Sequence, residues 1–236
     1  MPSWGRRSLA GVDPRAVEVD RGLERLYGRA ASRKPRDPLS ELVLTILSQN
    51  TSDRNSTAAE ESLLRALPTW AEVLAAPVDE VESAIRVGGL SRIKAPRIQQ
   101  VLAEVARREG SLSLNRLSGW PLESVTEYLL SIPGVGPKTA ACVALFSLGL
   151  PAFPVDTHVL RVAGRLGLID PRADSVKAHR ELAESVPPDR RYPFHVHLIE
   201  HGRRICRARV AHCEACPLTD RCDYFAARGP AATWSR

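Results

Sequence analysis

A lysine and an aspartate each stand at the start of an apolar segment, where an amine and a carboxylate can take part in one reaction. Lys138 comes directly after the turn 132–137 (IPGVGP), and Asp156 precedes another apolar run 18 positions further on. That distance accommodates one helix and a return loop, so the two groups can face each other across a cleft. A neutral amine can attack an electrophilic carbon when a neighbouring group activates it.

The turn before Lys138 has the composition of a phosphate-binding hairpin. Gly134 and Gly136 permit positive φ and close approach of the backbone, and Pro137 suits the first turn of a helix. The N–H groups at such a helix start can bind an anion such as a DNA phosphate. The alternative interpretations are that Lys138 contacts phosphate only and that Asp156 is only the N-cap of its helix.

Four cysteines near the C-terminal end have the spacing C-x6-C-x2-C-x5-C. Thiolates this close in sequence can surround one metal centre with little loop entropy. Structural zinc is the alternative, although it usually takes two CxxC pairs that are well separated in sequence. The fifth cysteine, Cys142, lies in an apolar run and is interpreted as a small buried hydrophobic residue. The candidate ligands are Cys206, Cys213, Cys216 and Cys222.

Composition narrows the class of protein. The chain has 236 residues and a net charge of +6, with a pI of about 9.4. This length suits one large domain or two modest ones, and the charge suits a polyanionic partner without identifying it. No apolar run approaches the roughly 18 residues of a membrane span, and no signal peptide is recognisable. We therefore expect a cytoplasmic protein with no membrane partner.

Apolar residues recur at helical spacing along most of the chain, and no convincing strand alternation is found. The pattern predicts an all-α fold, with residues 1–12 as a loosely held arm. Segment 111–121 is expected to be irregular. The predicted helices span residues 13–29, 37–47, 53–67, 69–76, 78–88, 94–107, 122–130, 138–148, 157–166, 175–184 and 192–205.

IPGVGPKTA followed by PVDTHVLRV resembles the hairpin and catalytic segments of the endonuclease III family of DNA glycosylases. The cysteine spacing, directly after HLIEHGRRIC, resembles the [4Fe-4S] loop of the same family. The resemblance covers roughly residues 37–226. It implies that Lys138 is the nucleophile, that Asp156 is the essential carboxylate and that the four cysteines bind a [4Fe-4S] cluster.

The resemblance also implies an all-α architecture of two lobes with a DNA cleft between them. One lobe is a six-helix barrel of residues 32–150, with its helix-hairpin-helix at about 122–149. The other is an iron–sulfur cluster lobe of residues 1–31 and 151–236. The segment 110–128 looks extended relative to shorter family members. The resemblance further implies a monomer associated with the nucleoid of a prokaryote.

Residues that contact double-stranded DNA are expected in several segments. Gln49 resembles the glutamine that fills the hole left by an extruded base, although it can also be a polar C-cap of its helix. Leu90 stands in a wedge loop in which Ser91 replaces a tyrosine-like position. The arginines near the cysteines suit contacts with DNA phosphates. The alternative interpretation is that they form a solvated basic face. The expected contacts are Gln49, Leu90, Gly134, Val135, Gly136, Thr139, Arg203 and Arg204.

The implied function is that of a bifunctional DNA glycosylase and AP lyase. Such an enzyme removes damaged bases, by family default oxidised pyrimidines, and nicks the abasic site by β-elimination through a lysine Schiff base. Two alternatives stay open: a glycosylase for mismatched uracil or thymine, and a non-catalytic DNA-binding iron–sulfur redox sensor. Intact Lys138 and Asp156 count against the sensor. The adenine-mismatch branch of the family lacks the lysine and is disfavoured.

Overall fold

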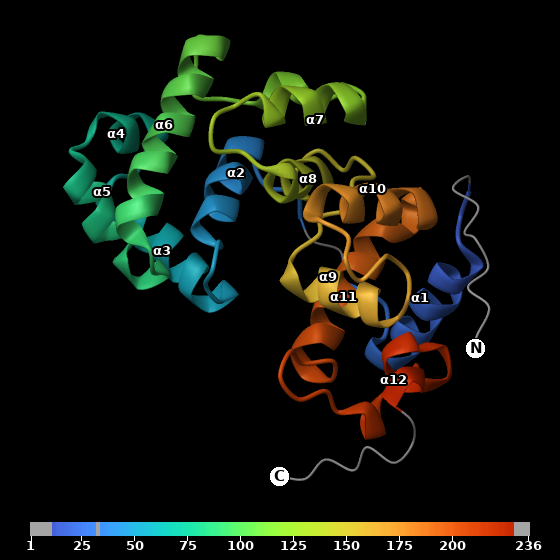
Figure 1. The fold of residues 1–236 in the computed structure, drawn as a ribbon. Helices are drawn as coiled ribbons and strands as arrows, with labels where there is room; N and C mark the ends of the chain where they lie inside the picture. Colours follow the sequence, from blue (N-terminus) through green and yellow to red (C-terminus); the bar gives the residue numbers. More distant parts are fainter. Residues whose placement is uncertain (1–10, 32–33, 229–236) are drawn as a thin grey trace. The chain divides into compact units, whose positions relative to one another are not determined.

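The computed structural model describes residues 11–31 and 34–228. Figure 1 shows helices and no strands in this part of the chain, where the only strand-like pairing is an isolated bridge between Cys206 and Ala211. The prediction of an all-α fold is therefore confirmed. Residues 1–10 of the predicted N-terminal arm lie outside the described residues. No described helix is both long enough and apolar enough to cross a bilayer.

The chain divides into two compact units. The hairpin unit is Arg33–Leu150, and the cysteine unit combines Met1–Ser32 with Pro151–Arg236. Each unit has its own set of packed helices (Figure 1). The helices of the hairpin unit are α2 Pro38–Leu47, α3 Asp53–Ala66, α4 Trp70–Ala75, α5 Val78–Ala84, α6 Ser91–Glu109, α7 Leu122–Leu130 and α8 Pro137–Phe146, with 3₁₀ turns at Arg86–Gly88 and Asn115–Leu117.

Local side-chain caps explain where the first helices of the hairpin unit begin. Asp37 accepts a hydrogen bond from the Ser40 N–H at 2.9 Å, and Pro38 occupies the first helical position of α2. Thr69 and Glu72 form a reciprocal capping box at the start of α4. These bonds join residues three positions apart, so the sequence alone encodes them.

The core of the hairpin unit centres on α2 and α8, which pack against each other. Helix α8 is buried on nearly every side from Thr139 to Leu145, as its continuous apolar sequence predicts. Helix α7 packs on α8, and α5 packs on α6. Each fully buried leucine, isoleucine or valine in this core contributes about 1.5–3 kcal/mol from apolar burial.

Helix α6 begins at Ser91, three residues earlier than predicted, and continues through Pro96. The reason is that the Leu90 carbonyl accepts hydrogen bonds from both Ile93 and Lys94, each at 3.0 Å, which closes the first turn. The helix ends at Gly110, whose left-handed conformation (φ 67°) provides a C-cap.

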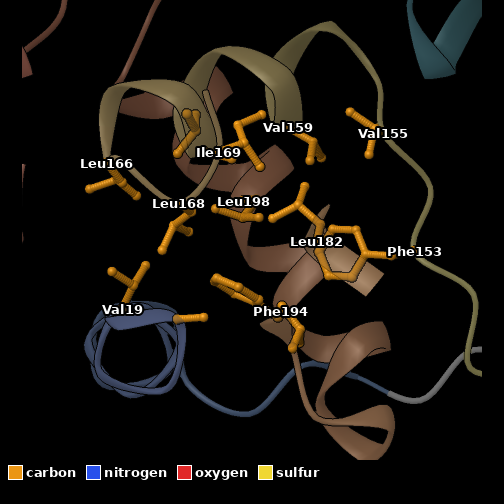
Figure 2. Close-up of a cluster of buried hydrophobic side chains, with 14 of the residues drawn as sticks. Val19, Phe153, Val155, Val159, Leu166, Leu168, Ile169, Leu182, Phe194 and Leu198 are labelled. Carbon is orange, nitrogen blue, oxygen red and sulfur yellow. The ribbon is translucent and has the colours of Figure 1, made fainter. Parts of the chain in front are cut away.

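The cysteine unit contains a second hydrophobic core. Helix α11 packs against both α1 and α9, and Figure 2 shows their side chains meeting around Phe194 and Leu198. Leu182 from α10 and Phe153 from the loop before α9 complete this cluster. The helices of the unit are α1 Pro14–Tyr27, α9 Thr157–Arg165, α10 Ser175–Ser185, α11 Arg191–Arg204 and α12 Asp223–Arg228, with 3₁₀ turns at Pro188–Arg190, Cys213–Ala215 and Thr219–Arg221.

The segment that looked extended in sequence, 110–128, is held against the end of α6 by charged and aromatic side chains. Arg116 lies 4.8 Å from the ring centre of Trp120 and 5.3 Å from that of Tyr128. It also forms an ion pair with Glu109, which lowers the pKa of that carboxyl, while burial raises the pKa of Tyr128 to about 12. The segment is therefore a packed part of the hairpin unit.

Candidate functional site

The glycine turn joins α7 to α8 and forms a helix-hairpin-helix. Gly134 has φ of 87°, and a Cβ atom at this position would lie 3.3 Å from Cγ of Arg97, so glycine is required here. Gly136 is the N-cap of α8 and Pro137 is its first residue, with no side chain capping the helix. Because the first N–H groups of a helix have no intrahelical acceptor, the start of α8 presents donors to an anion.

Two predicted DNA contacts in this hairpin have buried side chains. Val135 is only 7% exposed and Thr139 only 3%. Neither side chain is available to a large ligand. Contacts from these two residues can therefore be made only by backbone groups such as the Thr139 N–H, and they stay predictions in that form.

Lys138 occupies the second helical position of α8 and is half-buried. No hydrogen bond or ion pair engages its amine within the described residues. The neighbouring N–H groups and the positive end of the helix dipole favour negative charge beside this amine. The start of α8 can therefore bind a phosphate and present a lysine to it.

Asp156 is the N-cap of α9, as the simpler interpretation predicted. Its Oδ1 accepts a hydrogen bond from the Val159 N–H at 2.7 Å. Its Oδ2 has no hydrogen-bond partner in the part of the chain that the structure describes. The cap therefore fixes the carboxylate and leaves one oxygen for other chemistry. Lys138 belongs to the hairpin unit and Asp156 to the cysteine unit, so their meeting across a cleft stays a prediction.

Gln49 does not cap its helix, so that alternative interpretation is wrong. The C-cap of α2 is Ser48, whose N–H donates to the Leu44 carbonyl at 2.8 Å. The Gln49 side chain turns instead to α6, where its Oε1 accepts a hydrogen bond from Arg97 Nη1 at 3.0 Å. Gln49 is half-buried, which leaves part of its amide accessible.

Leu90 presents an apolar side chain from a strained backbone position. It has φ of 52°, in the left-handed region, and it is 48% exposed. A non-glycine residue held there costs on the order of 1–3 kcal/mol, and such strain clusters at functional sites. Val87 and Ile93, on either side in sequence, are also exposed large apolar residues.

Two residues of α6 that sequence reasoning missed, Lys94 and Arg97, contact these loops. Lys94 is only 2% exposed, and its Nζ donates to the Leu47 carbonyl at 2.7 Å and the Gly88 carbonyl at 2.9 Å. Burial lowers the pKa of the Lys94 ammonium. A signal was present in the sequence, because Lys94 falls on the same helical face as the apolar residues Ile98 and Val101.

The four predicted ligand cysteines lie together around one cavity of the cysteine unit. Its empty space is about 340 Å³, part of which is open to solvent. All four are free thiols. Cys206 Sγ accepts from Arg165 Nη1 at 3.3 Å, and Cys222 Sγ donates to the Arg165 carbonyl at 3.3 Å. Burial raises the pKa of Cys216 to about 11, with the neighbouring thiols adding to the effect.

This arrangement fits a thiolate-bound metal centre by its donor set. Within the described residues, no three His, Cys, Asp or Glu side chains already stand in a ligand geometry. The sulfurs instead contact Arg165 and His201, whose Nε2 lies 3.5 Å from Cys216 Sγ. Four half-buried thiols around one cavity are nonetheless a donor set that suits an iron–sulfur cluster, because a bound metal makes the thiolate form favourable.

Three histidines of α11 lie in the interior of the cysteine unit. His195, His197 and His201 are all buried. His195 Nδ1 is 2.8 Å from the Pro154 carbonyl, and His201 Nδ1 is 3.0 Å from the Tyr27 hydroxyl. Burial lowers the pKa of His201 to about 4. Cys142 is buried within α8, as predicted.

Arg203 and Arg204 lie exposed on the last turn of α11, next to the cysteine loop. Arg204 Nη1 is 3.1 Å from Glu200 Oε1, and its guanidinium lies 5.5 Å from the centre of the Tyr27 ring. An exposed pair of this kind is worth about 0–1 kcal/mol, so a phosphate can readily replace Glu200 as the partner. The basic face is available, and its contact with DNA stays a prediction.

Comparison with known proteins places this fold and hairpin in a class. Residues 43–188 match the HhH-GPD superfamily of base excision DNA repair proteins. The endonuclease III of Thermotoga maritima is 32% identical over 212 residues, covering 88% of this chain and 95% of that protein. The endonuclease III of Synechocystis is 32% identical over 218 residues, covering 92% and 95%.

A solved structure of an endonuclease III, trapped as a covalent intermediate with DNA in an estranged-adenine complex, has the same fold. It is 28% identical, with a TM-score of 0.76, and the match covers 90% of this chain and 98% of that one. This chain therefore belongs to the endonuclease III family of helix-hairpin-helix DNA glycosylases, which act in base excision repair.

Proposed function

We propose that this protein is a bifunctional enzyme, which removes a damaged base from duplex DNA and then cleaves the strand at the abasic site through Lys138. The observation that carries the proposal is the Lys138 amine, which has no partner within the described residues and stands at an uncapped helix start directly after the glycine hairpin. A relative trapped covalently on DNA supports covalent chemistry on this scaffold.

The target nucleotide must first leave the stack, because C1′ of its sugar is hidden in the duplex. Extrusion costs a few kcal/mol and costs least at a damaged pair. Gly134, Gly136 and the first N–H groups of α8 bind the phosphate backbone without reading sequence. Gln49 and Leu90 occupy and hold open the gap that the base leaves. The strained, exposed Leu90 supports that role.

The chemistry then takes place at C1′. The bond between C1′ and the base nitrogen breaks as Lys138 Nζ forms a bond to C1′, and the departing base takes up a proton. Asp156 stabilises positive charge at the sugar or accepts the lysine proton through Oδ2, while Oδ1 stays on the Val159 N–H. The C1′–O4′ bond then breaks, O4′ takes up a proton, and the opened sugar is joined to Nζ as a Schiff base, which acidifies a proton on C2′. Loss of that proton expels the 3′ phosphate and cuts the strand.

We assign the [4Fe-4S] cluster to Cys206, Cys213, Cys216 and Cys222. Bound to these four residues, which come from the loop between α11 and α12, the cluster would cross-link that loop next to Arg203 and Arg204 at the end of α11. Purified protein is then expected to be yellow-brown, with broad absorbance near about 400 nm and bound iron. Zinc without iron on metal analysis would contradict this assignment and favour the structural zinc alternative.

Oxidised pyrimidines in double-stranded DNA are the proposed substrates, with mismatched uracil or thymine as the second candidate. Both kinds of base would be removed by the same extrusion and covalent steps. Excision rates on a panel of duplexes, each with one kind of lesion, therefore decide between them. A non-catalytic redox sensor is disfavoured because a sensor has no use for the Lys138 amine and the fixed Asp156 carboxylate.

The direct test is borohydride trapping on a duplex with an abasic site. A Schiff base is reduced to a stable protein–DNA adduct, whereas a phosphate contact is not. Lys138→Gln is expected to abolish both the adduct and strand cleavage while leaving binding to undamaged DNA within a few-fold. Lys177→Gln, on the exposed face of α10, is the control and should trap normally. An undiminished adduct with Lys138→Gln would assign the nucleophile to another amine.

A further inference from the structure

Three loops of the hairpin unit contact DNA in the proposed function: the Gln49 loop, the Leu90 loop and the glycine hairpin. Helix α6 contacts all three. Its first two turns carry Lys94, which donates to the backbone at the ends of α2 and of the 3₁₀ turn Arg86–Gly88. One turn further, Arg97 donates to Gln49 Oε1. Near its end, Arg108 donates to the Ser131 carbonyl at 2.9 Å, just before the glycine hairpin.

The two carbonyls that bind Lys94 precede the proposed wedge residues by the same short distance. Leu47 stands two residues before Gln49, and Gly88 stands two residues before Leu90. Helix-terminal carbonyls need a donor, and an ammonium has three, so one buried Lys94 can serve both. Its position therefore couples the place of the Gln49 loop to that of the Leu90 loop.

Arg97 connects the Gln49 side chain with the hairpin. Its methylene stem packs over Gly134, with Cγ 3.3 Å from where a Cβ at Gly134 would stand. Its guanidinium has donors and no acceptor, so the Gln49 atom that faces it must be the carbonyl oxygen. The Gln49 amide nitrogen, with its two donors, is then the group left for other partners.

We propose that Lys94 and Arg97 are positioning residues, which hold Gln49 and Leu90 in fixed register with the glycine hairpin and orient the Gln49 amide N–H₂ toward the unpaired base. The inference rests on the proposed function, because it assigns Gln49 and Leu90 to the gap. Its consequence is that Arg97 acts on damaged DNA through Gln49. A base with acceptors on its exposed edge, such as guanine opposite the gap, is favoured by that orientation.

A double-mutant cycle between Arg97 and Gln49 tests this coupling. The measured quantity is the dissociation constant for a duplex with a tetrahydrofuran abasic analogue, relative to undamaged duplex. Arg97→Met keeps the apolar stem and removes the guanidinium. It is expected to weaken abasic-site binding about tenfold, as loss of a charge-assisted hydrogen bond predicts, and to reduce the preference for guanine over adenine opposite the gap. In a Gln49→Ala background the same substitution should add almost nothing.

Arg92→Met is the matched control on the same helix. The Arg92 side chain is 89% exposed, and the ion pair described for it is with Glu82 of α5, so its loss removes one positive charge and no hydrogen bond to either loop within the described residues. It should leave the ratio of the two dissociation constants unchanged. If Arg97→Met and Gln49→Ala prove additive while Gln49→Ala alone is selective for the abasic duplex, the coupling is wrong and the gap-filling role stands. If Gln49→Ala weakens both duplexes equally, the gap-filling role itself is wrong.

Lys94 has a separate readout, because its substitution also leaves two buried carbonyls without a donor. In Lys94→Met, hydrogen exchange is expected to rise together in the loops 48–52 and 88–90, by at least several-fold over the rest of the hairpin unit. Lys94→Arg, which restores a cation, should recover part of the protection. Unchanged exchange in either loop would contradict the proposed register. Should Lys94→Met not fold, the Arg97 cycle decides the inference.

Discussion

Helices α8 and α9 both begin after an irregular segment, but their N-termini are built in opposite ways. Helix α8 starts at Gly136 and Pro137 with no side-chain cap, so its first N–H groups remain available. Helix α9 starts at Asp156, whose carboxylate accepts from its own helix. An uncapped start binds an external anion, whereas a capped start fixes the anion that it carries. The first suits the grip of a phosphate, and the second suits the precise placement of a catalytic carboxylate.

The largest expected effect is on activity, and it comes from a substitution that removes the charge of Asp156 but keeps its capping of α9. Asp156→Asn keeps a side-chain acceptor for the Val159 N–H, because asparagine caps about as well as aspartate. We expect base excision to fall ~10²–10⁴-fold, as the loss of charge stabilisation or proton transfer predicts. The melting temperature should hardly change. Single-turnover excision and thermal unfolding measure the two effects.

Asp156→Ala completes that experiment. It removes both the charge and the cap, so it should add a loss of about 1 kcal/mol of stability to the same loss of activity. Full activity in Asp156→Asn would reduce Asp156 to a cap and leave the start of α9 with a structural role only.

The second prediction concerns the glycines before α8. Gly134→Ala places a Cβ atom at φ of 87° and against Arg97, so it should cost ~1–3 kcal/mol of stability and weaken binding to all duplexes. Gly136→Ala has ordinary φ and no atom within 4 Å of the new Cβ, which makes it the matched control. Its cost should stay under about 1 kcal/mol, the difference between glycine and alanine at an N-cap. Equal costs from urea unfolding would contradict the required turn.

The smallest expected effect is on the salt dependence of DNA binding. It distinguishes phosphate contacts made by neutral backbone N–H groups from those made by a charged arginine. Arg204→Met should reduce the slope of log K against log salt by about 1, because one cation no longer displaces counterions. Gly134→Ala should weaken binding with the slope unchanged, since N–H groups carry no net charge. A slope unaffected by Arg204→Met would leave that arginine as a solvated residue paired with Glu200.

Much of the fold was predictable because its signals are local. Helix periods, proline at first helical positions and caps such as Asp37, Thr69 and Asp156 all act within three or four residues. The all-α class, most helix bounds and the cysteine grouping therefore followed from sequence. The start of α6 did not, because it depends on the left-handed conformation of Leu90, which no local pattern favours for a leucine.

The sequence by itself was enough to identify the residues to which we assign the chemistry: the Lys138 amine after a glycine hairpin, the Asp156 carboxylate and four closely spaced thiols. The tertiary structure decided the burial and the hydrogen-bond partners of the residues around them. It buried Thr139 and Val135, joined Lys94 to a carbonyl 47 positions away, and turned Gln49 toward Arg97, 48 positions away. Spacing along the chain encodes contacts within a helical turn. A partner nearly fifty residues distant is selected by the packing of α2 against α6, and by the need of each buried polar group for a partner.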